Sequence, residues 1–261
     1  MRRWLTPVIE ALDQRQQPLQ VFVRDDDAGW DDGRLQRLVE LCDRQGATLD
    51  LAAIPCALGV DMGLWLADRI GERLGCHQHG YSHTNHATAG RKCEFGPDRA
   101  PEQQLSDLRR GWMRLERLLD GRTDPLFTPP WNRCTQATAD ALNTLGLQAL
   151  SRDAGAAPLR LGALQALPVH VDWMKHREPS IAATETPPAP DLTTLGMRLA
   201  EACRREPVLG LMLHHAVMLD ADFDALGELI VALQQSRHVE FVTMRTLLRS
   251  LRAQAALRRS A

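Results

Sequence analysis

Two short stretches of this chain hold residues that can do chemistry. The first is the aspartate run Asp25–Asp27, which ends the apolar segment that begins at Val21. The second is the segment 76–86, in which four histidines fall within ten residues and His79 and His83 are spaced as His-x-x-x-His. A carboxylate with two imidazoles makes a half-open site for a divalent metal, and such a site lowers the pKa of water towards neutrality. The chemistry indicated is metal-assisted hydrolysis.

Each stretch also has a structural interpretation. Three adjacent carboxylates repel one another, so they must be solvated, paired or metal-bound, and they could simply form a turn or cap a helix. On an extended backbone Asp26 points away from Asp25 and Asp27, whereas a turn starting here lets two of them face one site. If the segment from His79 to His83 forms one helical turn, both rings lie on one face and can share an ion.

The elements that must position these residues alternate between strand and helix, which predicts parallel strands covered by helices. Strands are predicted at 19–24, 48–54, 73–77, 125–128, 147–151, 164–171, 207–213 and 239–242. Helices are predicted at 6–16, 32–45, 61–69, 101–119, 135–145, 191–204, 223–235 and 244–257, and a proline-rich loop at 175–190. We expect one domain over 1–261, with the helix of segment 1–18 packed on it.

Polar clusters follow four of the predicted strands. The aspartates follow the first strand and the histidines the third, while Pro129–Asn132 and the pair His214 and His215 follow later strands. Because α/β barrels build their active sites at the carboxyl ends of their strands, we expect the four clusters to meet at one end of a barrel.

Bulk properties exclude several other classes of function. The 261 residues carry a formal net charge of −2, and the basic residues are scattered along the chain, so we expect no nucleic-acid partner. No stretch approaches the roughly 18 apolar residues of a membrane span. The first residues lack a continuous apolar core and a small-residue cleavage site, so we expect a cytoplasmic protein. The six cysteines are spaced singly, which indicates reduced thiols. The oligomeric state is left open.

Taken together, the motifs resemble the polysaccharide deacetylase family, the NodB-homology group of carbohydrate esterases. That family has a strand ending in Asp-Asp, then His-[Ser/Thr]-x-x-His, Arg-Pro-Pro-aromatic, Asp-Trp and a late Leu-x-His. The matches here keep the family's order over about residues 19–250: Arg24–Asp27, His79–His83, Thr128–Trp131, Asp172–Trp173 and Leu211–His214. The resemblance implies a distorted (β/α) barrel of about seven strands that removes an acetyl or other acyl group from a sugar or glycan precursor by cleaving a linear amide bond.

The resemblance also implies a metal site and a catalytic pair. Asp27, His79 and His83 would hold a divalent metal, with Asp26 as the general base and His214 as the general acid. Zinc suits one carboxylate and two imidazoles, while cobalt, nickel and manganese stay open.

Further residues are expected to support this centre. Asp172 would orient His214, and His77 and His86 would support the ligands or bind substrate. The residues expected to contact the carbohydrate or small N-acylated substrate are Trp131, Pro130, Arg24 and Trp173.

Two positions depart from the family pattern. Gly80 stands where the family has Ser or Thr, so the loop must be held differently, by Ser82 or Thr84. The arginine before Pro-Pro, which in the family engages the base, is replaced by Thr128, so its task falls to Arg24 or Arg133 or goes undone.

Several alternatives remain open from the sequence. Base and ligand could be Asp25 and Asp26 in place of Asp26 and Asp27, and His215 could replace His214 as the acid. The charged segment Arg91–Phe95 is either a substrate clamp or a solvated connector. The site could hydrolyse another linear amide or an N-formyl group, or the chain could bind saccharide or metal without turnover.

Overall fold

The computed structural model describes residues 3–177 and 188–260 of the chain. Its described strands form one sheet in the order β6-β5-β4-β3-β2-β1-β8-β7, and β9 pairs with the start of β1. All pairings between these strands are parallel. The strands are β1 Leu19–Ala28, β2 Leu49–Ala53, β3 Leu74–His79, β4 Leu126–Thr128, β5 Ala149–Leu150, β6 Gln165–Ala166, β7 Val171–Asp172, β8 Val208–Leu213 and β9 Val239–Phe241.

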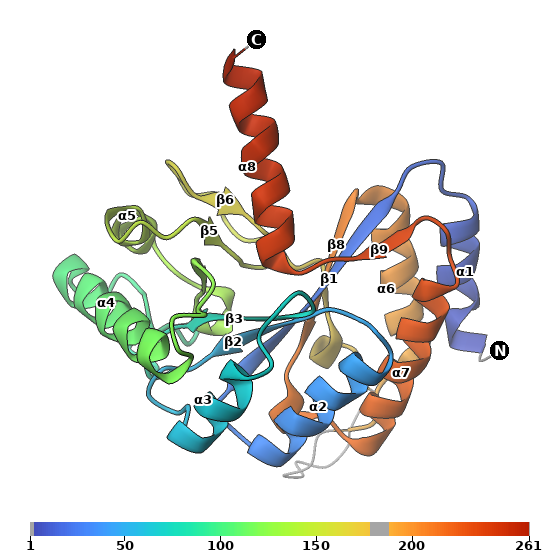
Figure 1. Cartoon of the computed structure of the whole chain (residues 1–261), viewed down its shortest axis with the longest axis horizontal. Helices are drawn as coiled ribbons and strands as arrows, with labels where there is room; N and C mark the ends of the chain where they lie inside the picture. The colour runs from blue at the N-terminus through green and yellow to red at the C-terminus, as the bar shows by residue number, and fades with distance from the viewer. Residues whose placement is uncertain (1–2, 178–187, 261) are drawn as a thin grey trace.

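The sheet curls into an open barrel with helices on its outside (Figure 1). The helices are α1 Thr6–Asp13, α2 Asp32–Arg44, α3 Val60–Ala67, α4 Pro101–Leu118, α5 Gln136–Thr144, α6 Leu192–Arg205, α7 Asp220–Gln234 and α8 Met244–Ser260. Among the described helices, none is long and apolar enough to cross a bilayer. The predicted α/β fold, a distorted barrel, is confirmed.

The pleat of β1 separates two kinds of surroundings. Val21 and Val23 face outward and join the main core beneath the helices, while Phe22 points into the barrel beside Leu126 and Met212. The alternation arises because successive side chains of a strand point to opposite faces. As far as Asp26, side chains at even positions of β1 therefore enter the barrel interior, and those at odd positions face the helices.

Several predicted strands differ from the observed ones at their ends, and two of the differences bear on the site. β1 does not end at Arg24 but continues through the aspartates to Ala28, because Asp25 and Asp26 find buried partners in His215 and Arg24. The strand predicted at 164–171 is two short strands, β6 and β7, separated by a segment that contains Pro168, which has no N–H for a sheet. The loop predicted at 175–190 lies largely outside the described residues.

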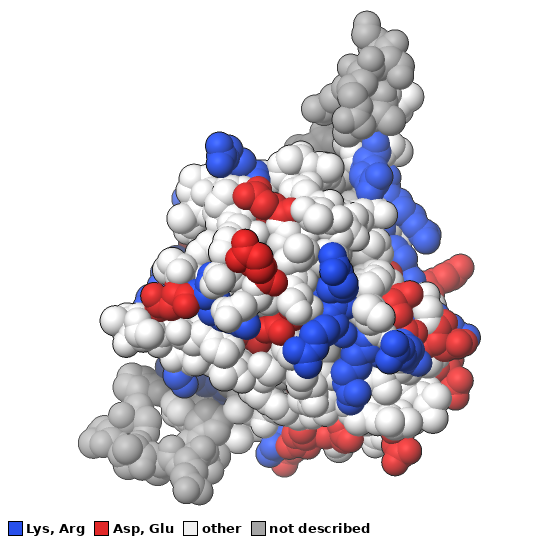
Figure 2. Space-filling model, turned by 90° about the vertical axis from the view of Figure 1, so that its left-hand side faces the viewer, with Lys and Arg blue, Asp and Glu red and all other residues white. Residues whose placement is uncertain are grey.

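Basic side chains are less scattered on the surface than along the chain. Figure 2 shows the face that includes α4, where Lys and Arg side chains gather on one part and acidic side chains lie around them. The exposed arginines of α4 are Arg109, Arg110, Arg114 and Arg117, and the last three recur at helical spacing and so share one side of the helix.

Candidate metal and catalytic centre

The three aspartates at the end of β1 separate into three different environments. Asp25 and Asp26 follow the alternation of the strand, so Asp25 faces the helices and Asp26 the barrel interior. The pairing with β2 then shifts its register between Asp25 and Ala28, and Asp27 takes a left-handed backbone with φ of 72°. This irregularity turns Asp27 towards the histidines, which a regular strand would not do.

Asp25 forms a buried ion pair with His215. The Nδ1 atom of His215 lies 2.5 Å from Asp25 Oδ2, its backbone N–H donates to Asp25 Oδ1 at 2.8 Å, and its Nε2 lies 2.6 Å from the carbonyl oxygen of Trp30. Burial alone lowers the pKa of His215, but the charge and hydrogen bonds of Asp25 outweigh it and raise the pKa to about 9. Both residues are thus occupied with each other, which leaves Asp26 and His214 for the site.

Asp26 is held by a buried arginine. The Nε and Nη2 atoms of Arg24 donate to the two oxygens of Asp26 at 2.8 and 2.9 Å. The same guanidinium donates to Ser151 Oγ at 2.7 Å and to Asn132 Oδ1 at 2.8 Å. Burial raises the pKa of Asp26, but the charges of Arg24, His79 and His214 lower it by more than burial raises it. The pKa of Asp26 therefore lies below its usual value.

The arginine missing before Pro129 therefore has a substitute. Arg24 reaches the carboxylate from the same strand, two residues earlier, while Arg133 donates to the carbonyl oxygen of Lys92 and takes no part in this contact. The structure thus places Arg24 in one of the roles that the sequence left open. Arg24 is fully buried in this structure, and its predicted role in contacting substrate stays a prediction.

Asp27, His79 and His83 converge as a candidate metal site. Asp27 Oδ1 lies 3.3 Å from His79 Nε2 and 3.2 Å from His83 Nε2. One ligand atom from each residue lies within 4.8 Å of the others. His79 Nδ1 lies 3.1 Å from the carbonyl oxygen of Thr128, and because a carbonyl can only accept, the proton of a neutral ring sits on Nδ1. The lone pair of Nε2 then points towards Asp27.

This donor set fits a divalent cation. Asp27 Oδ1 is buried and has no hydrogen-bond partner, so a carboxylate oxygen and two imidazole nitrogens face one another across a space that a cation can occupy. Burial lowers the pKa of His79, but the charges of Asp26 and Asp27 raise it above its usual value. The position therefore attracts positive charge, and a cation would displace a proton there.

A buried glutamate shapes the loop that carries the two histidines. Glu94 accepts hydrogen bonds from the backbone N–H of Tyr81 and of Ser82, the latter at 2.8 Å, and from Ser82 Oγ at 3.1 Å. At Gly80, where φ is 59°, an added Cβ would lie 2.2 Å from Glu94 Oε2 and 2.5 Å from Pro130 Cγ. Glu94 thus occupies the space that a Ser or Thr at position 80 would need. Of the two residues expected to hold the loop, Ser82 does so through Glu94.

The loop is not a helical turn. His83 has a left-handed backbone with φ of 56°, and the segment after His79 is irregular. The imidazole of His83 lies between two indoles, with ring centroids 4.8 Å from Trp30 and 4.5 Å from Trp131. The spacing of four residues brings the histidines together through a bend, and the helical interpretation of that spacing is wrong.

The other two histidines of the cluster lie in different places. His77 is buried, and its Nε2 lies 2.8 Å from the hydroxyl of Thr128, whose carbonyl orients His79. Burial lowers the pKa of His77 to about 3, so its ring is neutral. His86 is only partly buried, and its backbone N–H donates to the carbonyl oxygen of Cys93. His77 therefore supports a ligand indirectly, as the sequence suggested.

His214 follows β8 and lies near both carboxylates of the site. Its charge contributes to the low pKa of Asp26 and of Asp27, although burial acts in the opposite direction on both. Its Nδ1 is buried without a hydrogen-bond partner. Asp172, expected to orient it, instead accepts from the backbone N–H of Met174 at 3.0 Å and lies 3.3 Å from Lys175 Nζ. The predicted contact of Asp172 with His214 is not formed.

Only one of the predicted substrate-contacting residues lies at an accessible position beside the centre. Trp131 is partly exposed, with a left-handed φ of 55°, and lines a cleft next to the metal site. Pro130 is buried against Gly80. Trp173 is fully buried, and its indole N–H donates to Asp222 at 2.7 Å. The predicted substrate contacts of Pro130 and Trp173 therefore find no support in their positions and stay predictions.

Three residues of the centre were not assigned these roles from the sequence: Trp30, Glu94 and Ser151. Glu94 lay in a charged segment that reads as a connector, and its burial depends on the fold. Ser151 directly follows a predicted strand, which was the one available signal. Trp30 follows the aspartate run, but nothing in its spacing indicates contact with His83.

Comparisons with known proteins were made for the whole chain. No protein-family model and no curated protein matches it. Among solved structures, a candidate polysaccharide deacetylase from Mycobacterium smegmatis has a TM-score of 0.73 at 16% identity, covering 93% of each chain. A family 4 acetyl xylan esterase from Clostridium thermocellum, in complex with a cobalt ion, has a TM-score of 0.54 at 15% identity, covering 90% of this chain and 92% of its own.

A third similar structure shows that this fold also occurs in a protein described as a pseudoenzyme. A carbohydrate esterase family 4 pseudoenzyme from Bacillus anthracis has a TM-score of 0.59 at 12% identity, covering 89% of this chain and 66% of its own. Such identities establish the fold, and the activity has to be argued from the site. The resemblance predicted from the sequence motifs is confirmed at this level: the chain has the NodB-homology fold of carbohydrate esterase family 4.

Proposed function

We propose that this protein is a divalent-metal-dependent hydrolase that removes an acetyl or other acyl group from a nitrogen on a sugar or glycan precursor. The observation that supports the proposal is that two adjacent carboxylates have different partners. Asp27 faces His79 and His83, while Asp26 is held beside them by Arg24. A metal site and a separate, ionised carboxylate are what hydrolysis of an amide by water needs.

The residues present divide the reaction into defined tasks. Asp27, His79 and His83 would hold the cation, which when bound lowers the pKa of water and stabilises negative charge on a carbonyl oxygen. Asp26 is kept ionised by the bidentate contact with Arg24, so it can accept the proton of the attacking water. His214, as imidazolium, would protonate the leaving amine.

Zinc is the proposed ion, because one carboxylate and two imidazoles suit it. The cobalt ion in the Clostridium thermocellum esterase is consistent with a divalent metal in this fold. The neighbour is an esterase, so an oxygen-linked acetyl group belongs in the substrate panel. Other linear amides and N-formyl groups belong there as well.

A non-catalytic role is the second candidate, since a pseudoenzyme shares the fold. The loss of the arginine before Pro129 would favour it if nothing replaced that residue. Arg24 contacts Asp26 in its place, and Asp26 and His214 are both retained. A protein that only binds saccharide or metal has no need of both a base and an acid, so the centre supports turnover.

The test compares metal-reconstituted wild type with Asp26→Asn on a panel of N-acyl and O-acetyl saccharides. Removal of a general base typically costs about 10²–10⁴-fold in rate, so we expect a loss in that range with metal content unchanged. The exposed Asp32→Asn is the matched control and keeps full activity. If wild type hydrolyses no member of the panel faster than Asp26→Asn does, the protein is not this hydrolase.

A further inference from the structure

A polar cleft of about 960 Å³ lies beside the candidate metal centre. It runs from the segment after β4, past the residues that follow β5 and precede β7, to the exposed side of α6. Trp131 belongs to both sites, because its ring is 4.5 Å from that of His83 and it also lines the cleft. A group bound in the cleft can therefore belong to the molecule that reaches the metal.

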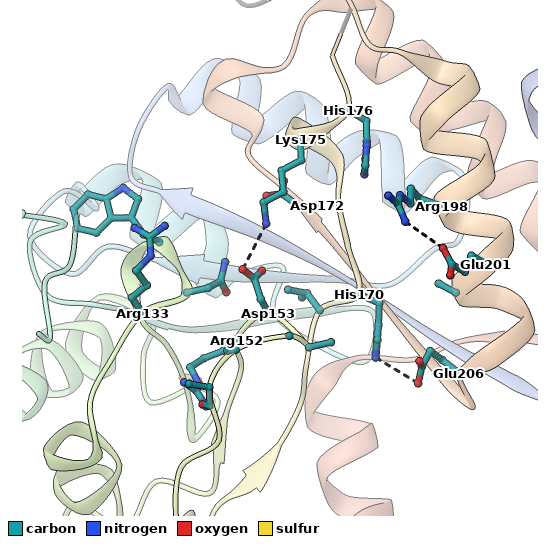
Figure 3. Close-up of a pocket in the computed structure, with 18 of the residues that line it drawn as sticks. Arg133, Arg152, Asp153, His170, Asp172, Lys175, His176, Arg198, Glu201 and Glu206 are labelled. Atoms are coloured by element: carbon teal, nitrogen blue, oxygen red, sulfur yellow. Dashed lines mark hydrogen bonds and ion pairs between the residues drawn. The ribbon is translucent and has the colours of Figure 1, made fainter. Parts of the chain in front are cut away.

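The wall of the cleft formed by α6 and its neighbours has its charges paired. Arg198 lies 3.3 Å and Arg205 2.9 Å from carboxylate oxygens of Glu201, and His170 lies 3.7 Å from Glu206. Figure 3 shows the first and last of these pairs on the same side of the cleft. This wall offers little free charge to a ligand.

The opposite wall presents guanidinium groups without carboxylate partners. Within the described part of the chain, Arg91, Arg133 and Arg152 form no ion pair. Arg133 Nη1 donates to the carbonyl oxygen of Lys92 at 2.8 Å, and Arg152 Nη2 to that of Ala157 at 3.0 Å. Figure 3 shows Arg133 and Arg152 across the cleft from Glu201 and Glu206. Backbone carbonyls thus fix these two guanidinium groups without neutralising them.

The charges of Arg91 and Arg133 interact on this wall. Partial burial and the charge of Arg91 lower the pKa of Arg133, although Asp153 acts in the opposite direction. The carboxylate of Asp153 lies 3.5 Å from Lys175 Nζ, so it is shared with another cation. Arrangements of this kind are stabilised when an anion binds between the guanidinium groups.

We propose that Arg91, Arg133 and Arg152 bind a phosphoryl group carried by the N-acylated sugar, so that the substrate is a sugar phosphate or a diphosphate-linked sugar. This inference rests on the proposed function. The planar donors of arginine match the oxygens of a phosphoryl group and bind it in bidentate fashion. The cleft lies within the roughly 300–1,000 Å³ of small-molecule sites, and Trp131 offers an apolar face to the sugar between phosphate and metal.

Binding is tested first, on the zinc-loaded Asp26→Asn protein, which should not turn substrate over. Calorimetry compares N-acetylglucosamine, N-acetylglucosamine 1-phosphate and uridine diphosphate N-acetylglucosamine. Hydrogen bonds between charged groups are stronger than neutral ones, so we expect at least about tenfold tighter binding of a phosphate-bearing ligand. Tighter binding of N-acetylglucosamine 1-phosphate would indicate a site for a terminal phosphate. Tighter binding of uridine diphosphate N-acetylglucosamine would indicate a site for a diphosphate ester.

The arginines are then removed in the same background. We expect Arg133→Ala with Arg152→Ala to abolish the preference, and the milder Arg133→Gln to reduce it, while the exposed Arg109→Ala keeps it. Equal affinity for neutral and phosphorylated ligands, or a preference that survives the double variant with its melting temperature unchanged, would overturn the proposal.

Kinetics on wild type separate this inference from the proposed function. With Asp26 retained, KM of the Arg133→Ala, Arg152→Ala protein should rise about tenfold or more for a phosphorylated substrate, with kcat and the hydrolysis of a neutral substrate unchanged. Hydrolysis without any advantage from phosphate contradicts the phosphate site and leaves the hydrolase intact. Arginine-dependent binding without hydrolysis of any N-acyl sugar contradicts the hydrolase and leaves the phosphate site standing.

Discussion

At the scale of single residues, the site depends on how one strand distributes three carboxylates. Asp25, Asp26 and Asp27 are identical in type and adjacent in the chain, yet a histidine, an arginine and a histidine pair give them separate surroundings. The sequence could supply the set of candidates and the likeness of their order to a family. It could not decide whether base and ligand are Asp25 and Asp26 or Asp26 and Asp27, because that depends on which of these carboxylates pairs with His215.

The substitution Arg24→Lys tests the arginine that holds Asp26. Lysine keeps a charge but cannot bind both carboxylate oxygens in one plane, and misplacing a catalytic group by about 1 Å can cost about a hundredfold in rate. We expect kcat to fall by about that factor. Because Arg24 lowers the pKa of Asp26 against the effect of burial, weakening it raises that pKa and moves the acid limb of kcat/KM to higher pH. Unfolding curves check that the protein remains folded, and an unmoved acid limb would contradict the role of Arg24.

The substitution His215→Gln tests the buried pair with Asp25. The folded pKa of His215, about 9, exceeds its usual 6.5, so its stabilising contribution is complete below about pH 6.5 and is lost as pH rises through 9. Removing one partner leaves a buried charge unpaired, so we expect a loss of about 3–5 kcal/mol at pH 6 that shrinks towards pH 9.5. Urea unfolding across this range measures it, with the half-buried His238→Gln as control. A pH-independent loss would contradict the ion pair.

At the scale of elements, the loop after β3 is where the sequence was least informative. The spacing of His79 and His83 suggested a helical turn, and the structure brings the rings together through a bend held by Glu94. Gly80 was recognised as a departure from the family pattern, but its compensation lies fourteen residues further along the chain. Local periodicity cannot reveal a contact that depends on the return of a distant loop.

The substitution Glu94→Gln tests that loop. The amide keeps the shape of the side chain but removes the charge that accepts two backbone N–H groups and Ser82 Oγ. Partners that orient metal ligands typically contribute about 10–100-fold to affinity, so we expect zinc to bind weaker by a factor in that range. Calorimetric zinc titration measures this, and exposed Glu72→Gln should match wild type. Unchanged zinc affinity in Glu94→Gln would show that the loop does not need the carboxylate.

The start of α8 is attached to the barrel by two buried carboxyl groups. Asp50 accepts from the backbone N–H of Met244 at 2.9 Å, and Asp124 lies 3.2 Å from Arg245 Nη1. Both lie over Gly75, where an added Cβ would be 2.4 Å from Asp50 Oδ1 and 2.7 Å from Asp124 Oδ2. Burial raises the pKa of Asp50 well above its usual value and that of Asp124 to about 6.

These raised values predict a second dependence of stability on pH. The folded protein holds the protons more tightly than the unfolded chain, so the contribution of Asp124 is complete below about pH 3.8 and is lost as pH rises through about 6. The raised pKa of Asp50 makes stability fall with rising pH in the same direction. Asp50→Asn removes one ionisable group and should flatten the decline of the melting temperature between pH 4 and 7. The exposed Asp61→Asn serves as control. A variant as steep as wild type would show that Asp50 does not cause the decline.

At the scale of the whole molecule, the strand–helix alternation and the order of motifs were enough to predict a distorted α/β barrel with its site at the carboxyl ends of the strands. The number of strands and the open side of the barrel were not predictable, because β5, β6 and β7 have two residues each. The cleft on that side joins segments that are far apart in the sequence, so its unpaired arginines became visible only in the folded chain.

The central claim is that Asp27, His79 and His83 together hold one divalent cation. The most direct measurement is the metal content of protein purified without a histidine tag, reconstituted with zinc and dialysed against metal-free buffer. We expect about one ion per chain in wild type, as a single site of this ligand set implies, and almost none in His79→Ala or His83→Ala, with His238→Ala matching wild type. Wild type that retains no ion, or a His83→Ala protein that retains as much as wild type, would contradict the claim.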